Sequence, residues 1–118
     1  MPRGLGEFEQ LLLFAVLRLG ERAYGVSIRQ EIARRTGKDV SAGAVYTGLD
    51  RLQSRGYVES RDAETAPGRG GRRRKYYRVA PDGARALAST YGKVTRMAEG
   101  ILDQLVELAA RGAAGTER

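Results

Sequence analysis

The chain has 118 residues, which is enough for one compact domain but not comfortably for two. It carries 21 basic and 14 acidic side chains, a formal charge of +7, and it lacks cysteine, histidine, tryptophan and asparagine. These absences exclude disulfides, thiolate nucleophiles and cysteine or histidine metal sites, and they remove the commonest general base. We therefore expect no enzyme, no metal and no cofactor, but a small basic binding domain.

The first predicted helix covers residues 8–19, where apolar side chains recur at helical spacing and also fill the opposite side. A helix that is apolar nearly all round is buried on more than one face, which indicates a partner beyond its own core in so small a domain. Its apolar run is far shorter than the roughly 20 residues of a membrane span, and no signal-peptide pattern accompanies it. We therefore expect a cytoplasmic protein without a membrane partner.

Two further helices are predicted over residues 24–36 and 41–55, each followed by a glycine that can end it. Ser41 is a favourable N-cap for the later of the two. In that helix the residues at i, i+4 and i+7 form an inner, apolar stripe, which comprises Val45, Leu49 and Leu52. The positions that point elsewhere are Gly43, Tyr46, Thr47, Asp50 and Arg51.

A β-hairpin is predicted next, with strands over residues 57–63 and 74–79 and a loop over 64–73. Residues 61–78 hold seven basic and two acidic side chains, so that +5 of the net charge is concentrated there. Clustered positive charge neutralises phosphates, although a basic loop on its own could equally be solvated. Adjacent strand residues face opposite sides, and we expect Tyr77, in step with Val79, to lie inside and Tyr76 outside.

The last predicted element is one long helix over residues 81–111, followed by a tail over 112–118 that we expect to be disordered. Seven apolar residues in the helix are spaced alternately by four and three positions, the heptad pattern of a coiled coil. This seam comprises Leu87, Tyr91, Val94, Ala98, Ile101, Leu105 and Leu108. A helix of about 30 residues spans about 45 Å, more than so small a domain can cover, and we expect it to form a homodimer. Gly92 and Gly100 lie off the seam and could bend it.

This order of elements predicts a mostly α protein with a small β-hairpin: a winged helix-turn-helix over residues 1–80 and a C-terminal dimerisation helix over 81–111. The helix at 41–55 has the right length to enter a DNA major groove with its first turns facing the base edges. A two-fold dimer would read an inverted repeat in double-stranded DNA. The wing would carry four basic side chains to phosphates or to a minor groove: Arg69, Arg72, Arg73 and Lys75.

Four segments, in order and with matching spacing, resemble PadR-type transcriptional regulators, in the shorter subfamily with a single C-terminal helix. They are LGEFEQLLL from Leu5, AYGVSI from Ala23, GAVYTGLDRL from Gly43, and RKYYRV from Arg74 followed by PDG. The resemblance covers about residues 5–90. It implies a dimeric bacterial regulator, usually a repressor, that a small-molecule effector often releases.

Carried over residue by residue, the resemblance places three side chains near the DNA backbone: Tyr24, Ser41 and Tyr46. It assigns groove contacts to Thr47 and Arg51 and a wing contact to Lys75. We also expect Ala42 and Gly43, in the first turn of the 41–55 helix, to lie at the DNA. An effector pocket between the first and last helices would be lined by Phe8, Phe14, Tyr91 and Met97, which core packing explains equally well.

A second function fits the same pattern of elements. A winged helix with a long terminal helix can serve as a protein-interaction module without specific DNA binding. Enzymatic activity does not fit it: carboxylates such as Glu7 and Glu9 are present, but no accompanying nucleophile or metal site is visible.

Overall fold

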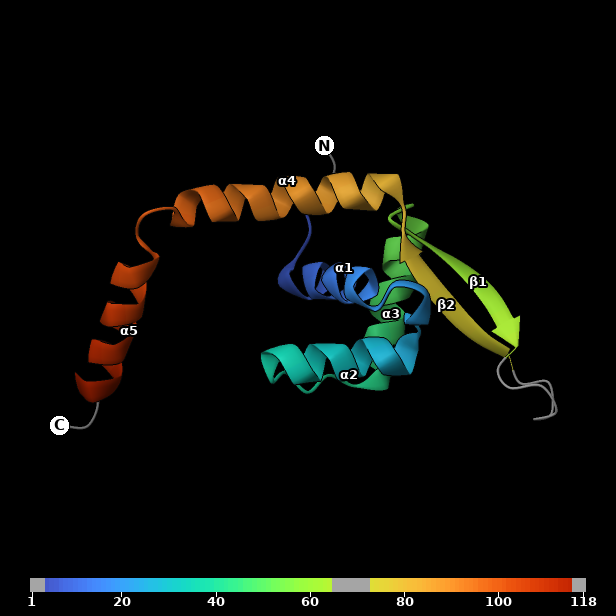
Figure 1. The fold of residues 1–118 in the computed structure, drawn as a ribbon, viewed down its shortest axis with the longest axis horizontal. Coiled ribbons are helices and arrows are strands. Elements are labelled where there is room, and N and C mark those ends of the chain that lie inside the picture. The colour runs from blue at the N-terminus through green and yellow to red at the C-terminus, as the bar shows by residue number, and fades with distance from the viewer. Residues whose placement is uncertain (1–3, 65–72, 116–118) are drawn as a thin grey trace.

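The computed structural model describes residues 4–64 and 73–115 (Figure 1). The α-helices in these ranges are α1 (Glu7–Leu19), α2 (Gly25–Thr36), α3 (Ala42–Ser54), α4 (Pro81–Ala98) and α5 (Leu102–Gly115). The strands are β1 (Val58–Glu64) and β2 (Arg73–Val79), and a short 3-10 helix, η1 (Gly20–Arg22), joins α1 to α2. The predicted mostly α architecture with one β-hairpin is confirmed.

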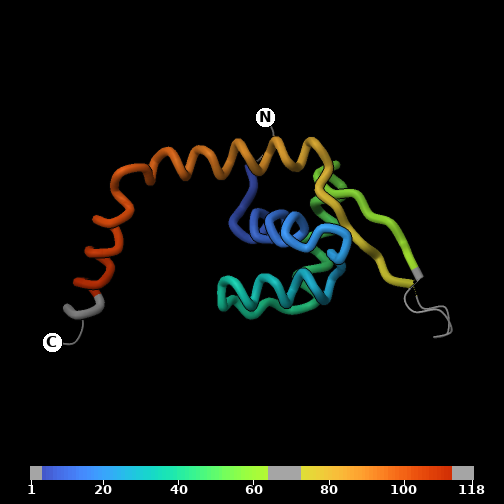
Figure 2. The backbone as a smooth tube through the Cα atoms, in the orientation of Figure 1, coloured from blue at the N-terminus to red at the C-terminus, as the bar shows by residue number. Residues whose placement is uncertain are grey.

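Helix α1 is the centre of the domain. It contacts α2, α3, β2 and α4, and the tube in Figure 2 shows it enclosed between α4 on one side and α2 on the other. Leu12, Leu13 and Val16 are almost completely buried; Leu12 and Val16 share one face, and Leu13 is turned about 100° from Leu12 around the helix. The prediction that this helix is buried on more than one face is confirmed, and its own domain supplies much of that burial.

Helix α3 folds as its spacing predicts. Val45, Leu49 and Leu52 are fully buried in the common core. The backbone N–H of Ala44 donates to the Ser41 hydroxyl at 3.0 Å, so Ser41 is the N-cap and satisfies one of the unpaired amides of the first turn. The positions predicted to point away from the core are all exposed.

The two strands pair antiparallel, with Val58 opposite Val79 and Glu64 opposite Arg73. Tyr77 is 4% exposed in the core, and Tyr76 is half-buried on the opposite face, as the alternation predicts. The Tyr77 N–H also donates to the Ala23 carbonyl at 2.8 Å, which fastens β2 to the start of α2. The hairpin is thereby held at a fixed position beside the helices.

The prediction of one continuous helix over residues 81–111 is wrong. Helix α4 ends at Ala98 and α5 begins at Leu102, and the two point in clearly different directions (Figures 1 and 2). The break is at Gly100, whose φ of +80° lies in the left-handed region that glycine adopts without the steric cost other residues bear.

The prediction of a disordered tail over residues 112–118 is wrong for its first part. Helix α5 continues to Gly115, while residues 116–118 lie outside the described ranges. Residues 102–112 of α5 are exposed throughout, and the helix stands away from the rest of the domain (Figure 1). Among residues 4–64 and 73–115, no helix combines the length and apolarity needed to cross a membrane.

Candidate nucleic-acid interface

The outward face of α3 is the first part of the candidate site. Because successive helical residues are rotated by about 100°, Gly43, Thr47 and Asp50 lie opposite the buried stripe of this helix. Tyr46 flanks them on one side and Arg51 on the other. All five are exposed, as is Ala42 in the first turn. This helix therefore presents polar side chains and a closely approachable backbone to an incoming ligand.

Tyr46 is held in place by the start of α2. Its ring and hydroxyl lie so close to Gly25 that a Cβ at this position would overlap with them. Gly25 is therefore required for the contact, since it leaves the space that the tyrosine ring occupies. Tyr46 itself remains 44% exposed. The contact fixes the orientation of α3 relative to α2 while keeping part of the tyrosine accessible.

Thr47 and Arg51 lie toward the N-terminus of the chain. Together with Ala44 and Gly48 they form one wall of an open hollow, whose other wall is residues 4–9. Phe8 belongs to this hollow, and its ring is also near Gly48. The structure thus places Thr47 and Arg51 on one accessible side of α3 and Phe8 beside them.

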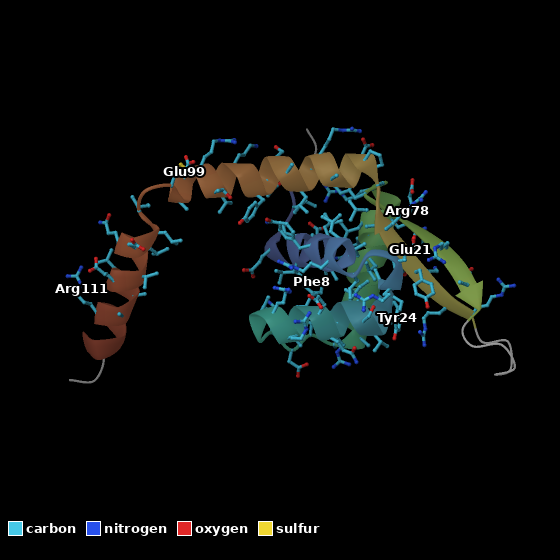
Figure 3. The ribbon with its side chains drawn as sticks, viewed as in Figure 1. Phe8, Glu21, Tyr24, Arg78, Glu99 and Arg111 are labelled. Atoms are coloured by element: carbon cyan, nitrogen blue, oxygen red, sulfur yellow. The ribbon has the colours of Figure 1, made fainter. Side chains whose placement is uncertain are left out.

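An arginine–tyrosine stack joins the hairpin to the start of α2; it consists of Arg61, Tyr76, Tyr24 and Arg74. The guanidinium carbon of Arg74 lies 4.0 Å from the centre of the Tyr24 ring, and that of Arg61 lies 4.8 Å from the Tyr76 ring. The two rings meet edge to face with their centres 5.7 Å apart. Figure 3 places Tyr24 at the end of α2 nearest the hairpin. The stack is a positively charged, aromatic surface between α2 and β2.

Sequence reasoning identified Tyr24 and placed Tyr76 outside the core, but it predicted neither the contact between them nor the part of Arg61 and Arg74 in the stack. Their contacts depend on the strand register and on how the hairpin packs against α2, and neither is visible in residue spacing. The concentration of arginine and tyrosine in residues 72–78 could have pointed to Arg74 and Tyr76, but Arg61 lies outside it.

Of the four predicted wing residues, Arg73 and Lys75 are described, and both are exposed on β2. By strand alternation they share the face that bears Tyr77. Arg69 and Arg72 lie outside the described residues. Burial raises the pKa of Tyr77, and the nearby carboxylate of Asp50 raises it further, so this tyrosine is neutral at neutral pH.

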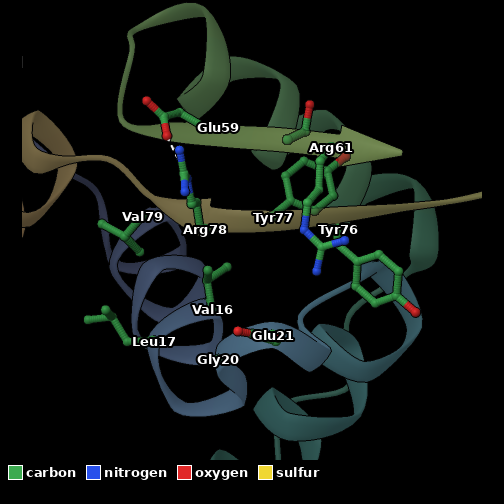
Figure 4. A pocket seen from close by; sticks show the side chains of 11 residues that line it. Val16, Leu17, Gly20, Glu21, Glu59, Arg61, Tyr76, Tyr77, Arg78 and Val79 are labelled. Carbon is green, nitrogen blue, oxygen red and sulfur yellow. Dashed lines mark hydrogen bonds and ion pairs between the residues drawn. The ribbon is translucent and has the colours of Figure 1, made fainter. Parts of the chain in front are cut away.

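A hollow of about 730 Å³ lies between the hairpin and the C-terminal end of α1 (Figure 4). Its charges are balanced: Arg78 donates to Glu59 at 2.7 Å across the two strands. Glu21 from η1 adds a further acid. The register likewise sets Asp62 opposite Lys75 and Glu64 opposite Arg73, so acidic residues accompany the basic ones along the hairpin.

A separate, smaller cavity of about 300 Å³ lies between α1, α2 and α4. Phe14 and Tyr91 line it and meet edge to face with their centres 5.4 Å apart. Met97, 80% exposed, and Phe8 do not line it, so the structure brings together only two of the four residues expected around an effector. The reason is that Phe8 lies at the start of α1, toward α3, while Met97 lies beyond the part of α4 that α1 covers.

Glu31, which sequence reasoning missed, is the buried acid of this cavity. It accepts from Arg35 at 2.8 Å and from Arg34 one helical position earlier. These hydrogen bonds, that of Arg35 first, lower the pKa of Glu31. Arg18 also lines the cavity, which therefore combines an aromatic side with a charged one. In the described part of the chain, no group of three or more acidic side chains is placed to hold a metal ion.

The fold divides the predicted dimer seam into a part that packs on its own domain and a part that is exposed. Leu87 is buried in the core of its own domain, and Tyr91 packs on Phe14. From Val94 onward the large residues of the seam are at least half exposed; they are Val94, Ile101, Leu105 and Leu108. The apolar surface available to a partner therefore begins where α4 extends past α1.

Comparisons with known proteins agree with this architecture. The family model described as "Transcriptional regulator PadR-like family" matches residues 13–89, more than half of the chain. A PadR family transcriptional regulator from Eggerthella lenta is 27% identical, with a TM-score of 0.64 over 84% of this chain and 86% of its own.

Two more distant structures share the fold. A transcriptional regulator from Clostridium thermocellum has 23% identity and a TM-score of 0.65 over 80% of this chain and 89% of its own. A PadR family regulator from Clostridium difficile has 22% identity and a TM-score of 0.63 over 83% and 98%. No curated protein sequence matches the chain. The family match, with the winged-helix geometry described above, establishes that the chain belongs to the PadR-like family of transcriptional regulators and is not an enzyme.

Proposed function

We propose that the protein is a dimeric, sequence-specific DNA-binding regulator that represses transcription in the cytoplasm and is released from DNA by a small-molecule effector. The observation that carries the proposal is the accessible face of α3, which lies beside an exposed, basic hairpin. A helix that is buried on one side and presents Thr47 and Arg51 on the other has the shape and chemistry needed in a major groove.

The DNA contacts divide into two classes. Thr47 and Arg51 would read base edges, with Ala42 and Gly43 allowing close approach at the start of α3. Tyr24, Ser41 and Tyr46 would contact the DNA backbone, as would Arg73 and Lys75 with the neighbouring Arg69 and Arg72. Arg74 belongs to the second class, because its guanidinium is held over Tyr24 at the surface between α2 and the hairpin.

The homodimer would form through the exposed part of the seam, which extends beyond α1. Two copies related by a two-fold axis present two α3 helices, as an inverted repeat requires. Because the seam lies on α4 and α5 while the DNA-contacting residues lie on α2, α3 and the hairpin, one chain could use both surfaces at once (Figure 1).

The effector would occupy the cavity between α1, α2 and α4. Its volume of about 300 Å³ is at the lower end of the range for small-molecule sites. A ligand between Phe14, Tyr91 and the charged groups Arg18, Glu31 and Arg35 would separate α4 from α2. Since α4 carries the dimer contact and α2 packs on α3, such a shift changes the distance between the two α3 helices.

Fluorescence anisotropy with labelled duplexes tests DNA binding. We expect salt-sensitive binding to an inverted repeat from upstream of the protein's own gene, and much weaker binding to a scrambled duplex. Arg73→Ala combined with Lys75→Ala removes four positive charges from a dimer; it should weaken binding to both duplexes and lower the salt slope by about 2 to 4. Equal affinity for the two duplexes would contradict sequence-specific binding.

The matched control is Lys93→Ala combined with Arg96→Ala. It also removes two positive charges from each chain, but these lie at exposed positions on α4. The salt slope should therefore stay unchanged. The alternative function, a protein-interaction module, predicts negligible affinity for either duplex together with a stable protein complex. The same titration therefore separates the two functions.

A further inference from the structure

The heptad pattern of the C-terminal segment continues without interruption across the break between α4 and α5. Ala98 is the last residue of α4, and Ile101 precedes the first residue of α5. Nevertheless the spacing from Ala98 to Ile101 and then to Leu105 is three and four positions, as it is on both sides. A seam can follow one side of a helix over these positions only when the backbone between them is helical.

The charged residues fit the same uninterrupted frame. With Tyr91 and Leu105 assigned to position a and Val94 and Leu108 to position d, seven of the eight charged residues between 81 and 111 occupy the outer positions b, c and f. They are Asp82, Arg85, Lys93, Arg96, Glu99, Asp103 and Glu107. Gly100 also falls at position c, on the outer side, where a helix tolerates a glycine without losing a seam contact.

In the bent chain the heptad pattern does not produce one continuous apolar face. Between Val94 and Leu108 the large seam residues are at least half exposed, and the bend turns their two halves in different directions (Figure 1). The bend depends on Gly100, since a φ of +80° is strained for any residue with a Cβ. A Cβ at this position would meet no atom within 4 Å, so backbone conformation and not crowding requires glycine there.

We propose that residues 81–111 have two states, bent at Gly100 in the single chain and straightened into one continuous helix when a second copy of the chain covers the seam. This inference rests on the proposed dimer and specifies the conformational change that accompanies it. Straightening aligns the halves of the seam, so that Val94, Ile101, Leu105 and Leu108 lie along one face.

A second copy is the partner that the seam suits. The positions that border a coiled-coil seam, e and g, usually carry the charges that select a partner. Here they are uncharged until Arg111, and they include the apolar Met97 and Leu102. No like charges therefore face each other when the surface meets its own copy, and the added apolar residues widen the contact.

Gly100 keeps both states accessible, and its replacement shifts the balance between them in a known direction. Alanine at this position disfavours the left-handed backbone of the bent state and favours the straight helix. Gly100→Ala should therefore tighten the dimer by about tenfold or more, measured by analytical ultracentrifugation of the full chain.

Gly92→Ala is the matched control. Gly92 lies inside α4, also on the outer side of the seam, and a Cβ there would approach only the mobile guanidinium of Arg96, at 3.4 Å. The backbone at Gly92 is helical in both states, so this substitution raises helix propensity without favouring either one. Its dimer dissociation constant should stay close to that of the unmodified protein.

Spin-label distances provide the direct measurement. The chain has no cysteine, so Ser89→Cys with Ala110→Cys introduces two unique, exposed labelling sites at position f, three heptads apart. In a continuous helix these residues are about 31 Å apart, and in the bent chain they are closer. Dilution of the labelled chain into excess unlabelled protein restricts the measurement to distances within one chain.

We expect the short distance in dilute monomer and a distance near 31 Å in the dimer. A dimer that retains the short distance, or that Gly100→Ala weakens, would overturn the inference while leaving the proposed dimer intact. A chain that stays monomeric at every concentration would instead refute the dimer itself. The two failures are therefore distinguishable.

Discussion

The contact between Gly25 and Tyr46 makes a quantitative prediction about the position of the recognition helix. In Gly25→Ala the new methyl group overlaps with the tyrosine ring, which must move or be compressed. Overpacking of this kind typically costs about 1–3 kcal/mol. Alanine recovers part of that through its lower conformational entropy in the unfolded chain, about 0.5–1 kcal/mol. We therefore expect a net loss of about 1 kcal/mol in the free energy of unfolding.

A double-mutant cycle with Tyr46→Ala isolates the contact. When the ring is absent, the methyl group at position 25 meets no tyrosine, and Gly25→Ala should become neutral or slightly stabilising. The coupling between the two substitutions should then be about 1–2 kcal/mol, within the range for residues in direct contact. Urea unfolding followed by circular dichroism measures all four free energies.

Gly43→Ala provides a control on the same helix. A Cβ at Gly43 would come no closer than 4.0 Å to the Ser41 hydroxyl, so the substitution should not destabilise the fold. Single-variant effects at Gly25 and Tyr46 that add to within about 0.5 kcal/mol would refute the claim that Gly25 positions Tyr46.

Three further predictions concern charge and protonation. The pKa of Glu31 lies below its ordinary value of 4.5, so its ionised form stabilises the fold above that pH. Unfolding of the native protein should therefore become easier as pH falls below 4.5, toward the lowered pKa. Glu31→Gln should flatten this dependence in acid urea titrations. Because the pKa of Tyr77 is raised above 10.0, its neutral form stabilises the fold below pH 10; stability should fall above that pH, and less so in Tyr77→Phe, as thermal melts at alkaline pH can show. Arg74→Ala removes the cation over Tyr24 and should lower the free energy of unfolding in urea by about 0.5–1 kcal/mol. It should also weaken binding to any duplex. Unchanged stability would show that the stack does not stabilise the fold.

Residue spacing was sufficient wherever one local pattern decided the structure. The stripe of Val45, Leu49 and Leu52 predicted the buried face of α3, because in an amphipathic helix the apolar stripe is the face that meets the core. Strand alternation separated Tyr77 from Tyr76 for a similar reason. These features depend on periods of 3.6 and 2 residues, which are properties of the chain itself.

Features that depend on distant residues were not predictable in this way. The break at Gly100 was missed for a different reason: the spacing of apolar residues does not show that this glycine adopts a left-handed backbone, and the heptad pattern continues through it. The cavity between α1, α2 and α4 contains Glu31 and Arg35, whose approach to Tyr91 requires the packed fold. Local sequence carries no information on that proximity.

The central claim, that two α3 helices read an inverted repeat, is tested most directly by hydroxyl-radical footprinting on the DNA upstream of the protein's own gene. We predict two symmetric protected segments whose centres are about 10 base pairs apart, or a multiple of this spacing, because each half-site receives one α3 helix from the same side of the duplex. Protection without two-fold symmetry, or none at protein concentrations that saturate non-specific binding, would contradict the account.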